Sequence, residues 1–251
     1  MTRIHDMGGR FGYGAIKLEK ADLNKSEIQN YVFEKDWHAK VWAFAHLTGP
    51  LGIWNLDVSR RFRESLPIDD YVNFSYYEKW LAALTNILIY YKVVGKSELV
   101  ELVEEIVNGK ESLERIKTDK KKNFSLQSKK QLPNKAVVLK TLGWGGSSER
   151  KTDLEPKFSR GEKVVTFFGN PNSDVRGGHT RLPNYAMGKV GIIHAYRGVH
   201  VFPDKNAHGF GEDPQPLYTV RFSSEILFGA EMDSIYSVFL DLWEPYLKTA
   251  L

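Results

Sequence analysis

Near its C-terminal end the chain reads Leu217-Tyr218-Thr219-Val220-Arg221-Phe222, and residues 218–222 have the β-branched and aromatic composition of a strand. Four further segments of this kind stand at residues 163–168, 190–196, 199–202 and 237–242, with Gly and Pro at close intervals between them. Several short strands within about 90 residues are typical of a small barrel or roll rather than an open sheet. We therefore expect an all-β domain over residues 158–251, and a small closed barrel of the SH3-like kind fits this length.

Residues 32–114 have the apolar spacing of helices instead, which predicts a helical domain and an α+β protein overall. The first helix has one apolar face, formed by Phe33, Trp37, Val41, Trp42, Phe44 and Ala45. A short charged helix is expected at residues 57–65, where Arg60 and Glu64 stand at i and i+4 and so face each other. A strongly apolar helix follows around residues 76–88.

The last helix of this domain is expected over residues 98–108. Ser97 suits its N-cap, and Gly109 suits the position just past its end. Its buried face is expected to hold Leu99, Leu102, Val103 and Ile106.

The remaining segments have the composition of an arm and a linker. Residues 1–31 are rich in glycine and carry apolar side chains that they cannot bury by themselves, which is typical of an extended N-terminal arm around a partner or of a disordered terminus. Residues 115–157 combine clustered lysines with glycine and serine, which predicts a basic flexible linker. A lysine run of this kind is usually a solvated segment, so nucleic-acid binding is not expected.

Bulk composition points to a protein of the cytoplasm that does not enter membranes. The chain has 251 residues, 42% of them hydrophobic and 26% charged, and no run approaches the roughly 18 apolar residues of a membrane span. The N-terminus lacks the apolar segment of a secretory signal. There are no cysteines, which excludes disulfides, thiolate metal sites and a cysteine nucleophile within this chain.

Common catalytic motifs are missing, and two arginines are of interest instead. We find no Walker loop, no G-x-S-x-G elbow, no H-E-x-x-H and no tight ligand spacing among the seven histidines. Arg60 is one of three arginines within four residues, and Arg181 lies in a Gly-Gly-His-Thr-Arg-Leu-Pro loop. A guanidinium group suits a carboxylate, a phosphate or another oxyanion. From the residues alone an ordinary surface ion pair is the alternative, just as core packing is the alternative for Tyr76 and Tyr77.

Taken together, motifs along nearly the whole chain resemble the β subunit of nitrile hydratase. The N-terminal part contributes Ile4-His5-Asp6-Met7-Gly8-Gly9, Gly12-Tyr13-Gly14, Phe33, Trp37, Arg60, Glu64, Tyr71, Ser75-Tyr76-Tyr77 and Trp80. The C-terminal part contributes Gly178-His179-Thr180-Arg181, Gly188-Lys189-Val190-Gly191, Gly209-Phe210-Gly211-Glu212, Leu217-Tyr218-Thr219-Val220, Phe222 and Asp241-Leu242-Trp243-Glu244-Pro245-Tyr246. Each piece alone is weak, but their order and spacing together make the match specific.

The resemblance implies a partner and a metal that this chain does not hold. In the family an α subunit carries non-corrin cobalt or non-haem iron on three cysteines, two of them oxidised, so a cysteine-free chain fits the partner role. The complex is expected to be an α2β2 heterotetramer that hydrates small nitriles to amides. Trp80 stands where some iron-type members have tyrosine, which favours cobalt. Lys79 departs from the histidine of several members, which puts a relay through that position in doubt.

The resemblance also gives individual residues a role. By motif position, Arg60 and Arg181 correspond to two arginines that hydrogen-bond the oxidised cysteine oxygens. Tyr76 corresponds to a tyrosine bonded to the same region, and Glu64 and His179 match residues that adjust the metal site from a distance. The pocket for the nitrile is expected to involve Leu56, Trp80 and Tyr77. Two alternatives stay open: a component of thiocyanate hydrolase, and a non-catalytic SH3-like module that binds RNA or assists metal maturation.

Overall fold

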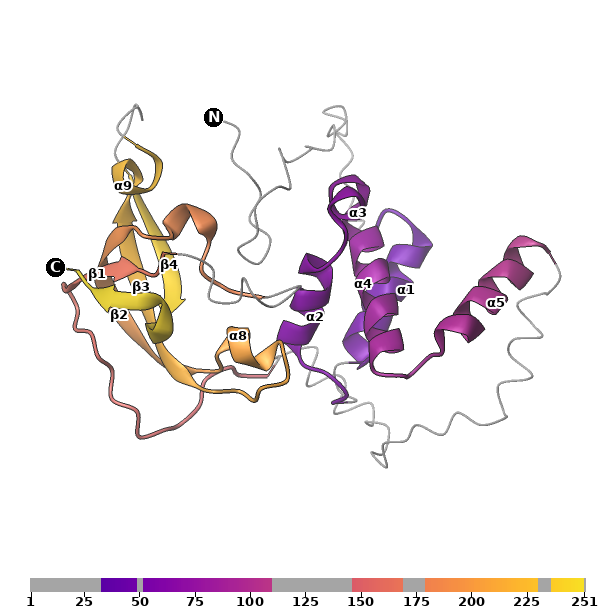
Figure 1. Ribbon diagram of the computed structural model, residues 1–251, viewed down its shortest axis with the longest axis horizontal. Helices are drawn as coiled ribbons and strands as arrows, with labels where there is room; N and C mark the ends of the chain where they lie inside the picture. The colour runs from indigo at the N-terminus through magenta and orange to yellow at the C-terminus, as the bar shows by residue number, and fades with distance from the viewer. Residues whose placement is uncertain (1–32, 49–51, 110–145, 169–178, 230–235, 251) are drawn as a thin grey trace.

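The structure is a computed structural model that describes residues 33–48, 52–109, 146–168, 179–229 and 236–250. A helical part and a part built on one antiparallel sheet lie side by side (Figure 1). These elements confirm the α+β class. The N-terminal arm predicted for residues 1–31 and most of the predicted linker, residues 115–145, lie outside the described residues.

Five helices make up the helical part: α1 (Asp36–Thr48), α2 (Leu56–Glu64), α3 (Ile68–Asn73), α4 (Tyr76–Tyr90) and α5 (Lys96–Val107). Helix α4 packs against both α1 and α2. The small core of the helical part is formed by Trp54, Val58, Leu84 and Ile87. The Ser75 amide donates to Glu78 Oε2 at 2.7 Å, which satisfies an N–H group that the start of α4 leaves open.

Helix α1 buries less of its apolar face than the pattern suggests. Val41 is buried, but Trp42 is 37% and Phe44 53% exposed. On α4, Leu84 and Ile87 face the core as expected, whereas Tyr76 is 62% exposed. Core packing therefore does not account for Tyr76 within the described residues.

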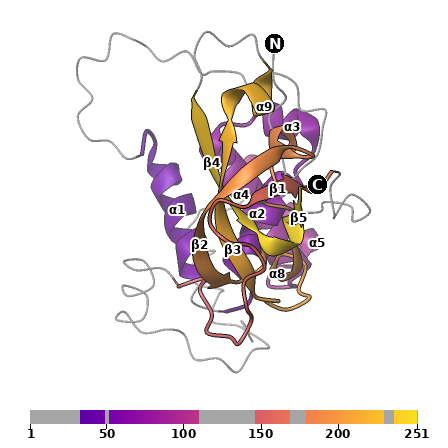
Figure 2. The same cartoon turned by 90° about the vertical axis from the view of Figure 1, so that its left-hand side faces the viewer.

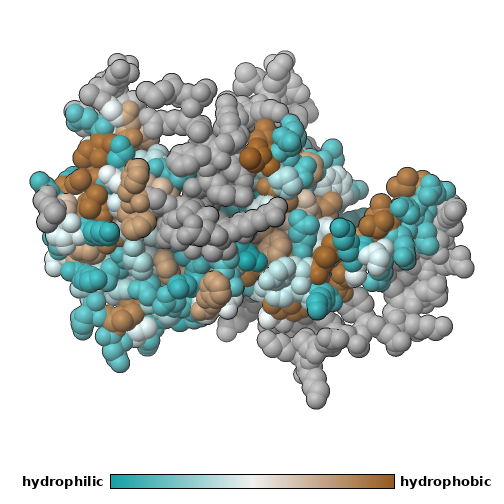
Figure 3. Space-filling view, in the orientation of Figure 1, coloured by the Kyte–Doolittle hydropathy of each residue, from teal (hydrophilic) through white to brown (hydrophobic). Residues whose placement is uncertain are grey.

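Helix α5 differs most from the expectation. The helix begins at Lys96, before the expected start at residue 98. Its N-cap is Gly95 rather than Ser97, because Glu98 Oε2 accepts from the Gly95 amide at 3.4 Å. Gly109 follows its end with φ of 66°, as predicted. The prediction of a buried face was wrong. No residue of α5 is buried, and Val103 and Ile106 are 49% and 45% exposed. Apolar spacing shows which face of a helix is apolar, but not whether another element packs against that face. Helix α5 lies apart from the other helices (Figures 1 and 3).

The sheet has five antiparallel strands: β1 (Lys163–Thr166), β2 (Val190–His200), β3 (Gln215–Ser223), β4 (Ser237–Trp243) and β5 (Leu247–Thr249). Their order is β4-β3-β2-β1-β5, so β4 and β5 stand at the two edges, and no pairing joins them among the described residues. The closed SH3-like barrel is therefore not confirmed. Figure 2, turned by 90°, brings the sheet part to the front of the view.

Strand β2 combines two predicted strands. Residues 190–196 and 199–202 were expected to be separate, yet β2 runs unbroken to His200, and residues 201 and 202 lie beyond it. Its register against β3 shifts between Tyr196 and Val199, around Gly198 with φ of 87°. A glycine at positive φ here bends the strand without ending it. Strand β5 was not predicted, because three residues are too short for a periodic signal.

The sheet covers a second, larger core. Its most deeply buried side chains include Tyr218, Phe222, Leu182, Ile193 and Leu242. Short elements close this core: η2 (Asn184–Ala186), α9 (Ser224–Phe228) and η3 (Glu244–Tyr246). None of the described helices is both long and apolar enough to cross a bilayer.

The last residues of the predicted linker are attached to this sheet part. The Arg150 amide donates to the Val199 carbonyl at 2.8 Å, and the Val201 amide donates to the Ser148 carbonyl at 2.8 Å. The Arg150 guanidinium also grips Glu212 through two contacts of 2.6 Å each. Residues 148–150 therefore run as an ordered edge along the end of β2.

Candidate functional site

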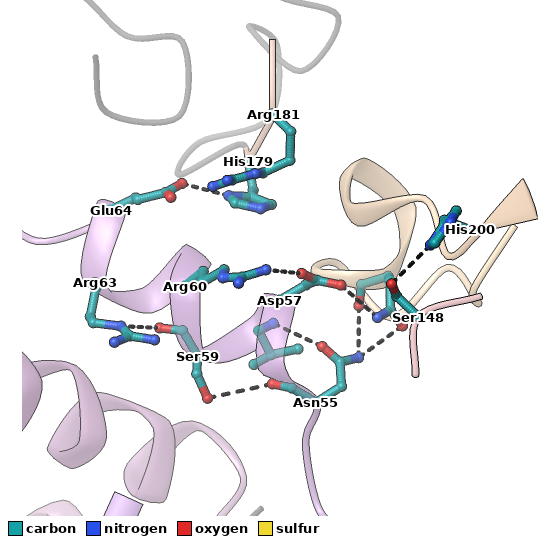
Figure 4. A network of polar contacts seen from close by, with 12 residues as sticks. Asn55, Asp57, Ser59, Arg60, Arg63, Glu64, Ser148, His179, Arg181 and His200 are labelled. Carbon is teal, nitrogen blue, oxygen red and sulfur yellow. Dashed lines mark hydrogen bonds and ion pairs between the residues drawn. The ribbon is translucent and has the colours of Figure 1, made fainter. Parts of the chain in front are cut away.

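The two parts of the molecule meet where α2 faces the short helix α8 (Pro203–Asn206). Asn55 caps α2, since its Oδ1 accepts from the Val58 amide at 2.9 Å. The Nδ2 group of Asn55 donates to Asn206 Oδ1 at 2.9 Å and to the Asn206 carbonyl at 3.1 Å. The Asn206 amide in turn donates to Asp57 Oδ2 at 2.8 Å. Helix α2 is thus fixed by its first turn to the sheet part (Figure 4).

Arg60 lies one turn further along α2, and its partner is not the one that its spacing suggests. Its Nη1 group donates to Asp57 Oδ1 at 3.2 Å, and 39% of its side chain stays exposed. Glu64, which the spacing places opposite Arg60, contacts His179. A guanidinium has five N–H donors and the Asp57 contact uses one. Arg60 therefore retains donors on an accessible side chain.

Glu64 contacts His179 across the junction. The Glu64 Oε2 atom lies 2.5 Å from His179 Nδ1, although 115 positions separate the two residues in the chain. The His179 side chain is fully buried, whereas 18% of the Glu64 side chain is exposed. Two residues that the sequence singled out separately are thus neighbours. The contact fixes the ring of His179, two residues before Arg181.

The Arg181 side chain is exposed, and its backbone is fixed by a hydrogen bond to Tyr246. Its amide donates to the Tyr246 hydroxyl at 3.1 Å, and Thr180 Oγ1 donates to the same oxygen at 3.2 Å. The Tyr246 hydroxyl donates to Asp204 Oδ1. Burial raises the pKa of Asp204 to about 6, against the lowering effect of the Tyr246 hydrogen bond and nearby His179. Burial also raises the pKa of Tyr246, so its hydroxyl stays protonated.

His208 lies between the two parts. Arg61 Nη1 is 3.1 Å from its Nδ1, and the His179 amide points at its Nε2 from 3.3 Å. Burial, then the Arg61 charge, lowers the pKa of His208 to about 4, so this imidazole is neutral near pH 7. Both neighbours present N–H donors, which favour the neutral ring.

A cavity of about 710 Å³ opens at the same junction. Leu56, Arg60 and Trp80, three of the predicted site residues, line it. Its lining combines the apolar side chains Trp54, Leu84 and Trp243 with the polar side chains Asp57, Asn206, Ser148 and Arg150. Such a combination of apolar surface and a few polar groups is typical of a small-molecule site.

Tyr76 and Tyr77 belong to an aromatic group on α1 and α4 beside that cavity. The Tyr77 ring stacks on His38 with centroids 4.6 Å apart, and Tyr76 contacts Trp80 at 5.6 Å. The Arg63 guanidinium lies 4.4 Å from the Trp80 ring centre, and burial lowers the pKa of Arg63. Trp80 thus joins the aromatic group to the cavity, while Tyr76 and Tyr77 do not line it.

Sequence reasoning missed the residues that hold these arginines. Asn55, Asp57, Asp204, Asn206 and His208 carry the contacts described above. Only Asn55 has a local signal, because asparagine just before a charged helix is a common N-cap. Asp57, Asn206 and His208 depend on pairings about 150 positions apart, and Asp204 pairs with Tyr246, 42 positions away; a single sequence displays neither.

Within the described residues, no group of three or more His, Asp or Glu side chains could hold a metal ion. Fold and site together define an α+β protein that presents arginines beside a cavity, where a helical part meets an antiparallel sheet. The sequence matches two family descriptions: "Nitrile hydratase beta subunit, N-terminal" over residues 1–130 and "Nitrile hydratase beta subunit, C-terminal" over residues 147–249. The chain belongs to the nitrile hydratase β-subunit family.

Three relatives match over all or nearly all of their length. The low-molecular weight cobalt-containing nitrile hydratase subunit beta of Rhodococcus rhodochrous is 33% identical, covering 100% of both chains. The cobalt-containing subunit beta of Pseudonocardia thermophila is 30% identical over 99% of this chain and 96% of its own. The subunit beta of Pseudomonas putida is 31% identical over 100% of both. A solved thiocyanate hydrolase from Thiobacillus thioparus covers 38% of this chain and 78% of its own, with 22% identity and a TM-score of 0.34.

Proposed function

We propose that this chain is the β subunit of a nitrile hydratase, which adds water to a nitrile to give an amide together with an α subunit. Membership of the β-subunit family over residues 1–130 and 147–249 carries the proposal, since it spans both parts of the molecule. The cavity lined by Leu56 and Trp80 at their junction supports it, because it offers an apolar recess to a small organic substrate.

The metal is assigned to the α subunit. Relatives named cobalt-containing favour cobalt over iron, and this chain has no cysteine with which to bind either. When bound, such a metal supplies Lewis-acid activation of the nitrile or of water. This chain's own contribution is a set of hydrogen-bond donors. Oxidised cysteines carry buried anionic oxygens, and buried anions need charge-assisted donors.

Arg60 and Arg181 are proposed to supply those donors from two different elements. Arg60 stands on α2 with accessible N–H groups, and exposed Arg181 follows His179 on the loop that Glu64 contacts (Figure 4). The Glu64–His179 contact would keep this loop at a fixed place relative to α2. Tyr76, also exposed, would reach the α subunit, and Tyr77 would border the substrate route behind Trp80. We further propose an α2β2 assembly in the cytoplasm and a sheet part related to SH3-like barrels.

Co-expression with an α subunit that carries a Cys-x-Leu-Cys-Ser-Cys motif tests the proposal. We expect a co-purifying complex that contains metal and converts a nitrile to its amide. A chain that never associates with such a subunit, or a metal-loaded complex that forms no amide, would contradict the assignment. Thiocyanate and single-stranded RNA are assayed beside the nitrile. Turnover of thiocyanate alone would favour the thiocyanate hydrolase alternative, and salt-dependent RNA binding without amide formation would favour a binding module.

The roles of the two arginines are tested in the same complex. We expect Arg60→Lys and Arg181→Lys each to lose most of the activity, because lysine keeps the charge but not the planar fork of donors. Arg221→Lys is the matched control, since Arg221 is exposed on β3 and does not line the cavity. The control should keep wild-type rates. Near-wild-type rates in both site variants would contradict the roles given to Arg60 and Arg181.

A further inference from the structure

Asn206 lines the cavity, and its side chain also contacts the carboxylate of Asp57, the residue that holds Arg60. Asn206 lies at the end of α8 and is half-buried. Its side-chain carbonyl accepts from Asn55, and its side-chain amide donates to Asp57. Both ends of this side chain are therefore occupied by the first turn of α2.

Asp57 connects Asn206 to Arg60. Only 10% of its side chain is exposed, and its two oxygens have different partners: Oδ2 accepts from Asn206 at 2.8 Å and Oδ1 from Arg60 at 3.2 Å. A buried carboxylate needs hydrogen bonds on both oxygens. The bond from Asn206 fixes the orientation of the carboxylate, and this orientation points Oδ1 at the Arg60 guanidinium.

Without Asn206, the Asp57 carboxylate would lose one of its two partners. It would then rotate toward the cavity, which both Asp57 and Arg60 line, and take the Arg60 guanidinium with it. Asn55 does not readily replace that donor, because it stays bonded to the Asn206 backbone carbonyl and to the Val58 amide. The position of Arg60 therefore depends on a side chain of the sheet part.

We propose that Asn206 is a positioning residue, which orients the Arg60 guanidinium through Asp57. The proposal rests on the function proposed above, in which Arg60 donates hydrogen bonds at the active site. The same short helix also supports the loop of Arg181, because Asp204 accepts from Tyr246, whose hydroxyl accepts from the Arg181 amide. Residues of α8 therefore support both arginines: Asp204 through Tyr246 for Arg181, and Asn206 through Asp57 for Arg60.

The test uses the α–β complex with the variant Asn206→Ala. We expect its kcat to fall about tenfold, the loss associated with one hydrogen bond to a charged group, while KM stays within about threefold. Lys205→Ala is the control on the same helix; Lys205 is exposed, and its variant should keep wild-type kinetics. In the double variant with Arg60→Lys, removal of Asn206 should cost no further activity, because both changes act through one guanidinium.

Other results would overturn the positioning role. Wild-type kcat in an intact Asn206→Ala complex would do so, as would a double variant whose losses multiply. If Asn206→Ala fails to assemble, Asn206→Ser is put through the same comparison, and failure of both variants to assemble would assign Asn206 a purely structural role.

A separate readout distinguishes this proposal from the proposed function. If the wild-type complex forms but produces no amide, the nitrile hydratase assignment is wrong, and the crystal structure of the Asn206→Ser complex decides the positioning role. Loss of the Arg60–Asp57 contact supports it, and retention of that contact overturns it.

Discussion

Arg60 and Glu64 show why neighbours on a helix need not be partners. They stand one turn apart on α2, where an ion pair would stabilise the helix by about 0.2–0.5 kcal/mol. Arg60 instead contacts Asp57, and Glu64 contacts the buried His179. A buried imidazole leaves an unsatisfied polar group unless it finds a partner, which costs about 1–3 kcal/mol. The tertiary contact therefore takes precedence over the local one.

Asp204 should make the stability of the chain fall as the pH rises. Its folded pKa of about 6 lies above the ordinary value of 3.8, so the folded state binds its proton more tightly. The stabilisation is complete below pH 3.8 and is lost as the pH rises through 6, by about 3 kcal/mol in total. In Asp204→Asn, the free energy of unfolding at pH 7.5 should exceed the wild-type value by up to this amount, and the difference should shrink toward pH 4. Denaturant unfolding at the two pH values checks this; identical pH dependence in both proteins would contradict it.

At the level of the strand, β2 depends on a residue that has no side chain. A Cβ atom on Gly191 would lie 2.6 Å from Val220 Cγ1 and 2.8 Å from Phe222 Cε1. Both neighbours are buried on β3, so neither side chain has room to move. The Gly188-Lys189-Val190-Gly191 motif is thus explained at its last position by close packing between strands.

Gly191→Ala should lower the free energy of unfolding by about 1–3 kcal/mol, the usual cost of overpacking a core. Gly146→Ala is the matched control, because a Cβ there meets nothing within 4 Å. Thermal or denaturant unfolding of the two variants beside wild type measures the difference. Equal stability of the two variants would show that β2 and β3 can separate to admit a methyl group.

The sequence predicted the elements better than their limits and surroundings. The composition of residues 190–196 and 199–202 indicated strands, but it gave no sign that β2 continues past Gly198 through a shift of register instead of ending there. Leu99 and Leu102 indicated a helix, but not that α5 would leave its apolar face half open. Local spacing indicates whether a segment is a helix or a strand. What packs against that element depends on the rest of the fold or on another chain.

At the scale of the molecule, His208 makes the junction sensitive to acid. Its folded pKa of about 4 lies below the ordinary 6.5, so its stabilising effect is present above pH 6.5 and is lost as the pH falls through 4. We expect His208→Gln, which cannot gain the proton, to lose less thermal stability than wild type between pH 7.5 and pH 4.5. Melting temperatures at the two pH values test this. An equal or larger loss in the variant would place the acid sensitivity elsewhere.

The sequence predicted some residues of the site, and only through family motifs. It did not predict the hydrogen bonds that hold these residues in place. Arg60, Glu64, His179 and Arg181 stand within recognisable motifs, so the family resemblance identified them. The resemblance gave no sign of the contacts made by Asn206 or Asp204, because hydrogen bonds across the junction leave no periodic trace. Family membership is confirmed, while the roles of these residues stay predictions for the experiments above.

The long separations within the junction also bear on the order of folding. Its hydrogen bonds join residues 115 to 151 positions apart, from Glu64 with His179 to Asn55 with Asn206. Closing loops of this length costs entropy that is recovered only after both ends have formed their own cores. We therefore expect α2 and the sheet to form first and the junction that carries both arginines to form last. A partner subunit that recognises both arginines would then select chains that have finished folding.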